Sequence, residues 1–426
     1  MGGLDPRALA LLVLCAAPLS LFFVIAIVAV LGRKLPELVL GAAARVSLSA
    51  SAITSLALVV VYLVDGRGPS TVSAGDWFSA GGGHFELVFL VDARSITFGA
   101  LAASACGVVG AFSFRYLHKE PGYQRYFAQL ALFSLGLTSV AFAGSAEVLF
   151  AGWELLGLSS ALLVGFFHDR RAPVNNALRV FAAYRISDAA MLAAVALLHH
   201  WAHSGDLHAL FGADPTYLDH AKLVVIGLLL LVAVAGKSAL LPFSGWLPRA
   251  MEGPTPSSAI YYGALSIHAG CYLLLRVQPL IAQSILLEGV AVLAGASTAV
   301  YATFVGRAQA DVKSMLSYAA LAQVGLIVTE IALGFTTLAM VHLVGHACFR
   351  LLQFLLAPNI LHDMSRVQVA PRRRGLSEGA YAAALFGGGL DALVERLFVR
   401  PFLAVMRRAD RLDRTLSGAP DESRER

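Results

Sequence analysis

The chain has 426 residues, of which 58% are hydrophobic and 14% are charged, and its mean hydropathy is +0.72. Soluble proteins carry about 25% charged residues, so this composition excludes an ordinary soluble enzyme and predicts an all-α polytopic membrane protein. The net charge of +5 comes from basic residues scattered between apolar runs, which excludes nucleic acid as a partner.

Apolar runs long enough to cross a bilayer recur along the chain. A hydrocarbon core of about 30 Å requires roughly 20 apolar residues per helix. We therefore predict eleven transmembrane helices, at residues 8–31, 38–64, 94–113, 124–144, 146–167, 177–198, 222–243, 255–275, 279–305, 312–333 and 335–357. Asp5 and Arg7 precede the first run and a second run follows it directly, so we predict a retained helix and not a cleaved signal.

Lysine and arginine concentrate in alternate loops. These loops hold Arg33 and Lys34; Arg115, Lys119 and Arg125; Arg170 and Arg171; Arg249; Arg307; and Arg366 with Arg372, Arg373 and Arg374. Cytoplasmic loops carry the excess of basic residues in membrane proteins. The pattern predicts an external N-terminus and a cytoplasmic loop at residues 358–378.

Composition divides the chain into three parts. Residues 1–93 hold N-terminal helices and an external loop, residues 94–357 a helical core, and residues 358–426 a cytoplasmic loop, an amphipathic helix and a polar tail. The external loop ends in the alternating HFELVFLVD, which predicts a short hairpin that acts as a lid. Apolar residues at helical spacing in 390–414 predict an amphipathic helix on the membrane surface or against a partner, and a disordered tail follows.

Histidine and cysteine patterns argue against a metal site. The external loop 199–221 holds five histidines, but HHxxH lacks the carboxylate and spacing of a zinc motif, which favours a solvated loop. The cysteines fall inside predicted spans with no short pairing and are predicted to be packing residues; they are Cys15, Cys106, Cys271 and Cys348. We predict no metal, no iron–sulfur cluster and no disulfide.

Lys237 is the most informative residue of the sequence. It follows the apolar run 223–235 and is itself followed by the proline-rich stretch SALLPFSGWLPRAMEGPTP. An ammonium group at membrane depth costs roughly 2.5–3.5 kcal/mol, so a lysine kept there normally marks an ion or proton route. The prolines predict a broken helix near the membrane centre, whose freed carbonyl groups can hydrate that route.

Other ionisable residues fall inside neighbouring predicted spans. Glu154 lies in an apolar helix and would be protonated there unless a cation is close. Arg185 and Asp188 are three residues apart and can pair on one helix face. Each has a structural alternative, because Glu154 can cap or pair locally and Arg185 with Asp188 can form a purely structural ion pair. Their occurrence together with Lys237 favours a polar axis through the bilayer.

Three histidines extend this axis. His268 lies in the eighth predicted span, and His342 and His346 lie four residues apart in the eleventh, with Arg350 one turn further. Imidazole can accept a proton on one nitrogen while donating from the other, which suits a relay. The alternatives are a hydrogen-bonded core histidine for His268 and a metal site at His342 and His346. Neither a carboxylate nor a cysteine on that helix completes such a site, and Glu330 is predicted at the interface.

Four blocks of the sequence resemble a known family. Residues 152–167, 237–276 (with WLPRAMEGPTP), 311–327 and 342–355 resemble the antiporter-like proton-translocating subunits. These comprise the subunit 5 (NuoL-type) chain of respiratory complex I, its membrane-bound hydrogenase relatives and the large subunit of Mrp sodium/proton antiporters. The resemblance covers roughly residues 90–357. It implies that Glu154 and Lys237 are the family's carboxylate–lysine pair, Asp188 its sixth-helix aspartate, and His342 and His346 its relay histidines.

The chain departs from the family pattern in three places. Tyr262 stands where the family usually has a histidine, and His268 falls where a threonine is common. Arg350 occupies a position that is often lysine and cannot release its proton. The family continues into a twelfth helix with a second buried lysine, so the second half-channel is expected to be truncated or supplied by another subunit. Shortened chains of this kind also resemble the DabB-type component of inorganic carbon uptake systems.

These observations predict a proton-translocating subunit of a larger energy-coupling complex, of either the respiratory quinone oxidoreductase type or the inorganic carbon uptake type. The energy source is expected in a partner, such as a soluble or peripheral catalytic subunit, because the sequence has no dinucleotide loop, Walker motif or cysteine cluster. We therefore predict no cofactor. The alternatives are a structural membrane anchor without proton conduction and a sodium/proton antiporter subunit. The predicted location is a bacterial inner membrane.

Overall fold

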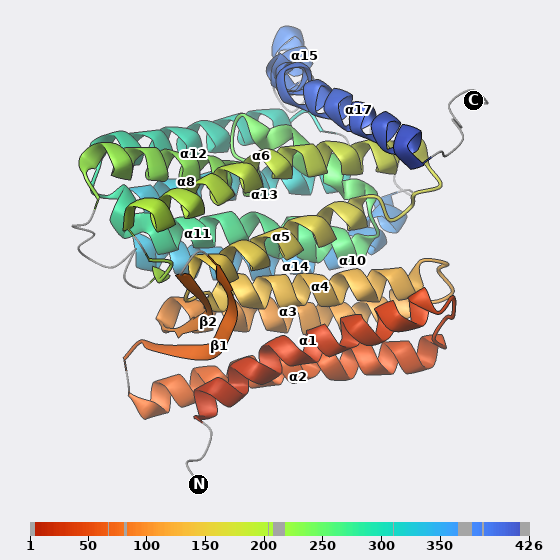
Figure 1. Cartoon of the computed structure of the whole chain (residues 1–426). Helices are drawn as coiled ribbons and strands as arrows, with labels where there is room; N and C mark the ends of the chain where they lie inside the picture. Colours follow the sequence, from red (N-terminus) through yellow and green to blue (C-terminus); the bar gives the residue numbers. More distant parts are fainter. Residues whose placement is uncertain are drawn as a thin grey trace.

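The computed structural model describes residues 5–66, 68–80, 83–202, 204–207, 218–309, 311–364, 377–385 and 387–417. Long helices running side by side make up most of this part of the chain (Figure 1). Ten of the described helices are long and apolar enough to cross a membrane: α1 (Pro6–Val30), α2 (Glu37–Asp65), α3 (Ala93–Tyr116), α5 (Ala146–Val164), α6 (Arg171–Ala202), α8 (His220–Lys237), the composite helix Thr255–Ile281, α12 (Ile285–Gly306), α13 (Val312–Ala332) and α14 (Thr336–Met364). The polytopic all-α fold is thereby confirmed.

The remaining predicted span, at 124–144, is the helix α4 (Tyr123–Phe142), which is not among these ten. It packs against α1, α3 and α5, and most of its side chains are buried. A Cβ added at Gly136 would lie 2.9 Å from the carbonyl oxygen of Gly152 on α5, so the two backbones touch. This contact fixes α5 against the core of the bundle.

A hairpin follows α2, as predicted for the first external loop. β1 (Ser70–Ala80) pairs antiparallel with β2 (Gly83–Val91), with Ser70 opposite Val91. The backbone N–H of Gly144 donates to Val88 (2.8 Å), and Phe89 forms a bridge with Ala143. The hairpin is therefore joined to the connection between α4 and α5.

Helix α8 ends at Lys237 itself and not at residue 243 as predicted. Ala239 has a left-handed backbone (φ +55°), and Pro242 has no N–H to continue the helix. The chain then proceeds through three short turns, η1 (Phe243–Gly245), α9 (Trp246–Arg249) and η2 (Ala250–Glu252). The predicted helix break therefore lies directly after the lysine.

The next span contains a π-helical stretch. It comprises α10 (Thr255–Ser257), the π-helix η3 (Ser258–Leu265) and α11 (Ser266–Ile281). π-Helical turns inside α-helices are frequent at functional sites, and His268 lies just after this one. The predicted boundary near Pro279 is wrong, because α11 continues through this residue. Pro279 cannot donate to the carbonyl of Leu275, and the guanidinium of Arg94 donates to it instead (2.7 Å).

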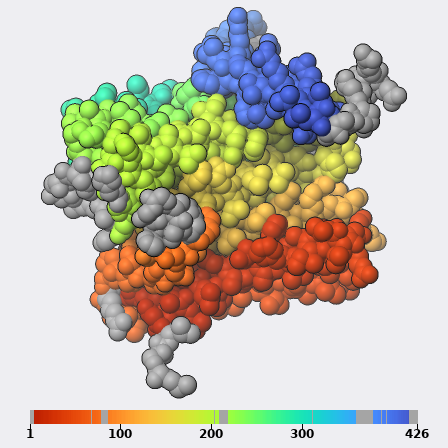
Figure 2. Space-filling model, in the orientation of Figure 1, coloured from red at the N-terminus to blue at the C-terminus, as the bar shows by residue number. Residues whose placement is uncertain are grey.

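The C-terminal residues form short helices on the flank of the bundle. They are α15 (Glu378–Leu385), η4 (Gly387–Gly389), α16 (Leu390–Val394), η5 (Glu395–Val399) and α17 (Arg400–Ser417). Figures 1 and 2 show this blue segment on the far side of the bundle from α1 and α2. The helix predicted at 390–414 is confirmed. Most of the basic loop that is predicted to be cytoplasmic (365–376) and the tail beyond residue 417 lie outside the described residues.

Candidate functional site

Lys237 is fully buried where α5, α6 and α8 meet. Its Nζ lies 3.3 Å from Oδ1 of Asp188 and donates to the backbone carbonyl of Trp153 at 3.3 Å. The rings of Trp153 and Tyr184 flank the ammonium, with centroids 4.8 and 4.4 Å away. Aromatic faces attract a desolvated cation, so the carboxylate, the carbonyl and both rings hold the charged lysine.

Two glycines make room for this arrangement. A Cβ added at Gly157 of α5 would lie 2.9 Å from the Nζ of Lys237. A Cβ added at Gly236 would lie 2.5 Å from Cβ of Ser187, whose hydroxyl donates to the carbonyl of Ala233 on α8. Neither glycine was predicted as part of the site, although Gly157 lies one turn after Glu154.

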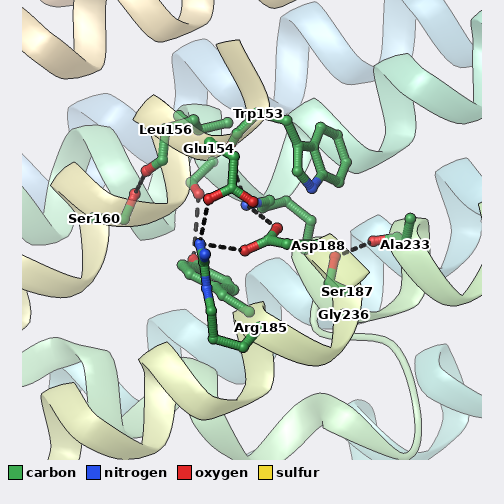
Figure 3. Close-up of polar contacts among 12 residues, drawn as sticks. Trp153, Glu154, Leu156, Ser160, Arg185, Ser187, Asp188, Ala233 and Gly236 are labelled. Carbon is green, nitrogen blue, oxygen red and sulfur yellow. Dashed lines mark hydrogen bonds and ion pairs between the residues drawn. The ribbon is translucent and has the colours of Figure 1, made fainter. Parts of the chain in front are cut away.

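Arg185 lies between the two carboxylates of the site (Figure 3). Its guanidinium contacts Oε2 of Glu154 at 2.6 Å and Oδ2 of Asp188 at 2.7 Å. Glu154 makes no ion pair with Lys237 within the described residues; Asp188 takes that place. The pairing of Arg185 with Asp188, three residues apart on α6, therefore occurs together with an interhelical bridge.

Charge and burial are balanced across this four-residue site. Two carboxylates face two cations, so the formal charges cancel. Lys237 and Asp188 are 0% and 3% exposed, whereas Arg185 and Glu154 are 30% and 28% exposed. The site thus runs from an enclosed ammonium to a half-buried carboxylate. Removing one partner of a buried pair is costly, because it leaves the other charge uncompensated.

A second polar group joins α11 to α14. His268 is fully buried, and its Nε2 lies 2.9 Å from Nδ1 of His346. Nε of Arg350 donates to Nε2 of His346 at 3.0 Å. Because arginine only donates, His346 accepts on Nε2, carries its proton on Nδ1 and donates that proton to His268. Arg350 therefore sets the direction of the hydrogen bond between the histidines.

His342 faces a different helix from its neighbour on α14. Its Nδ1 lies 2.9 Å from Glu330 and its Nε2 lies 3.0 Å from Oε1 of Gln323, both on α13. The rings of His342 and His346 are 6.3 Å apart between centroids. His342 therefore belongs to a pair with Glu330, and the participation of Gln323 had no signal in the sequence.

The lysine and histidine groups have no direct contact within the described residues. Between them, the hydroxyl of Tyr184 lies 3.4 Å from Oγ of Ser266, two residues before His268. Tyr262, at the position where the resemblance implies a histidine, donates to the carbonyl of Ser160 at 2.6 Å. Its hydroxyl is thus engaged in joining η3 to α5.

The end of the molecule that is predicted to be external carries two further charged contacts. His199 pairs with Glu147 at the start of α5, whereas His203 and His208 of the histidine-rich loop lie outside the described residues. Arg276 contacts Asp92, the N-cap of α3, at 2.5 and 3.0 Å. These contacts fasten the helix ends around the hairpin.

Two sequence profiles match the chain. The profile described as "NADH:quinone oxidoreductase/Mrp antiporter, TM" matches residues 143–385. The profile described as "NADH-Ubiquinone oxidoreductase (complex I), chain 5 N-terminus" matches residues 77–127. The first match contains all the residues of the lysine and histidine groups.

Curated relatives include respiratory proteins. NADH-ubiquinone oxidoreductase chain 5 of Allomyces macrogynus is 31% identical over 350 residues, which cover 82% of this chain and 54% of that protein. NAD(P)H-quinone oxidoreductase chain 5 of Picosynechococcus sp. is 30% identical over 298 residues, covering 68% of this chain and 45% of that protein. The chain spans about half the length of these curated relatives.

Two solved structures are similar. A chain in the Mrp complex from Dietzia sp. DQ12-45-1b gives a TM-score of 0.72 at 26% identity, covering 82% of this chain and 38% of that chain. A chain of the membrane-bound sulfane sulfur reductase, an archaeal respiratory membrane complex, gives a TM-score of 0.69 at 18% identity. The match covers 92% of this chain and 87% of that chain. The second likeness concerns the fold alone.

Proposed function

Because the chain belongs to the NADH:quinone oxidoreductase/Mrp antiporter transmembrane family, we propose that it is a proton-translocating membrane subunit of a larger energy-coupling complex. The observation that carries this proposal is the enclosed ammonium of Lys237, paired with Asp188, which shares Arg185 with Glu154. A charge kept at such depth is normally functional.

In this proposal, Lys237 holds the transferred proton and Arg185 controls how firmly it is held. Arginine stays charged, so its guanidinium competes with the ammonium for Asp188. When Arg185 moves toward Glu154, Asp188 is left to the lysine and the proton is retained. When Arg185 moves toward Asp188, the hold on the ammonium weakens and the proton leaves.

The released proton passes toward the histidines. The ring of Tyr184 flanks the lysine, its hydroxyl lies 3.4 Å from Oγ of Ser266, and in this proposal internal water joins these hydroxyls to His268. His268 and His346 then exchange a proton along their hydrogen bond. Because Arg350 occupies the far nitrogen of His346, exit requires that this contact opens. His342 with Glu330 accepts the proton next.

The contacts favour protons over sodium as the coupled ion. Within the described residues, the carboxylates of Glu154 and Asp188 are engaged by Arg185 and Lys237. A hard cation requires several oxygen ligands, and these oxygens already contact cationic nitrogens. Activity should therefore be independent of sodium at fixed pH. A sodium requirement would support the antiporter alternative.

The alternative is a membrane anchor in which the same ion pairs only stabilise the bundle. The double variant Glu154→Met with Lys237→Met separates the two, measured by proton flux in proteoliposomes of the chain with its co-purifying subunits. Asp219→Asn with Lys222→Met is the control, since it removes an exposed ion pair at the other end of α8. We expect lost flux only in the first variant. Retained proton flux in the first variant would support the membrane-anchor alternative.

The partners and location are part of the proposal. The names of the relatives and of the Mrp complex support a membrane complex with other subunits. We propose that one of these subunits is a soluble or peripheral catalytic one. The relatives from Picosynechococcus and Dietzia support a bacterial inner membrane. Membership of the inorganic carbon uptake branch stays a prediction. Identification of the co-purifying subunits tests the proposed partners and the membership of this branch.

A further inference from the structure

A groove of about 700 Å³ lies between the C-terminal end of α1 and the N-terminal end of α4. Its floor is apolar, with Phe22, Ile25 and Ala29 on α1 and Ala128 on α4. Alanines leave space here that longer side chains would fill. This volume is within the range of about 300–1,000 Å³ that is typical of small-molecule sites.

The mouth of the groove is basic. Arg33 and Lys34 of the α1–α2 loop line it together with Lys119 and Arg125 near the start of α4. Within the described residues, no hydrogen bond or ion pair engages the side chains of Arg33, Lys34 or Lys119. Arg125 donates to the carbonyl of Phe166 at 2.7 Å. The groove is lined by four basic residues and two acidic ones, Glu37 and Glu120, so its mouth keeps a net charge of +2 above an apolar floor.

Of the two acidic residues that line this mouth, Glu37 is already engaged in hydrogen bonds. Its Oε2 lies 2.7 Å from Nδ1 of His118, and its Oε1 accepts from the backbone N–H of Lys119 at 3.2 Å. The backbone N–H of Leu35 donates to Oε1 of Gln124 at 2.9 Å, which fastens the α1–α2 loop to α4. These contacts hold the two basic loops in place without neutralising their side chains.

We propose that this groove binds one anionic phospholipid. The phosphate contacts Arg33, Lys34 and Lys119, and an acyl chain lies along Phe22 and Ile25. A free phosphate ion would satisfy the mouth alone and leave the floor exposed to water. Basic pockets between helices on the cytoplasmic side are suited to anionic headgroups, and the distribution of basic loops predicts that this end is cytoplasmic. The inference is independent of the proposed proton transfer.

The test compares lipids on the full-length chain with its co-purifying subunits in detergent. Phosphatidylglycerol should raise the melting temperature and remain bound in native mass spectrometry, whereas phosphatidylcholine and inorganic phosphate should do neither. Arg33→Gln with Lys34→Gln should weaken phosphatidylglycerol binding about 30-fold. The control, Arg170→Gln with Arg171→Gln, removes two adjacent exposed arginines on the same side and should bind normally.

A second variant tests the floor. Ala29→Phe keeps every charge and fills the groove, so it should also abolish retention of phosphatidylglycerol. Melting temperatures without added lipid establish that each variant is folded. Equal stabilisation by inorganic phosphate, equal retention of phosphatidylcholine, or unchanged binding by either groove variant would each overturn the proposal.

Discussion

Asp188 contacts both cations of the buried site, which makes its replacement the most informative perturbation. Asp188→Asn keeps the shape of the side chain but removes its charge, leaving Lys237 without an adjacent anion and the site with one excess positive charge. Breaking a buried ion pair costs about 3–5 kcal/mol. The protein can limit this cost by releasing the lysine proton.

The free-energy cost of releasing the lysine proton follows from the ordinary pKa of lysine. Neutralising a lysine with a pKa of about 10.4 at pH 7 costs about 4.6 kcal/mol, at 1.36 kcal/mol per unit. This cost lies within the range for breaking a buried ion pair. We therefore expect Asp188→Asn to be destabilised by about 3–5 kcal/mol at pH 7, with Lys237 neutral in the folded variant. The unfolded variant then binds one more proton than the folded one. Its stability relative to the unchanged chain rises by about 1.4 kcal/mol per pH unit.

Chemical unfolding in detergent between about pH 7 and pH 9 measures this slope. Asp219→Asn is the matched control, since its partner Lys222 is exposed and needs no such release. In the control we expect a small loss of stability that does not change with pH. A pH-independent loss in Asp188→Asn, or no loss at all, would refute the view that Lys237 is held as a buried cation.

Two further predictions concern packing at Gly157 and the ion pair of Arg276 with Asp92. Gly157→Ala should displace the ammonium of Lys237, lower the stability by about 1–3 kcal/mol and reduce proton flux. Gly289→Ala is the control and should change neither quantity, because a Cβ there meets no atom within 4 Å. Unaltered flux in Gly157→Ala would contradict the packing argument. Burial raises the pKa of Asp92, but the charge and hydrogen bonds of Arg276, together with hydrogen bonds from Ser95, outweigh it and hold that pKa below its usual value. The stability it contributes is therefore complete above about pH 3.9 and is lost as pH falls through the lower folded value, so Asp92→Asn should flatten the acid limb of the unfolding curve.

The sequence predicted features that have local signals. Apolar length predicted the spans, alternation predicted the hairpin, and the prolines after Lys237 predicted the broken helix. The predicted end of α8 at residue 243 lies six residues beyond the observed end, because the residue type of Ala239 does not indicate a left-handed turn. The continuation of α11 through Pro279 depends on a donor from Arg94, which is distant in sequence.

Features of the site that depend on helix rotation could not be predicted. Glu154 and Asp188 lie on different helices, and only the relative rotation of α5 and α6 places Arg185 between them. His342 and His346 share a helix face by spacing, yet they contact different partners, because α13 supplies Glu330 to the first. Residue types fixed which groups are buried, and packing decided which of them meet.

The most direct test of the account is proton flux in proteoliposomes with Lys237→Ala, compared with Lys222→Ala on the same helix. We expect both variants to assemble with their partner subunits and only Lys237→Ala to lose uncoupler-sensitive flux. Unchanged flux in an assembled Lys237→Ala variant would contradict the claim that the buried ammonium carries the proton.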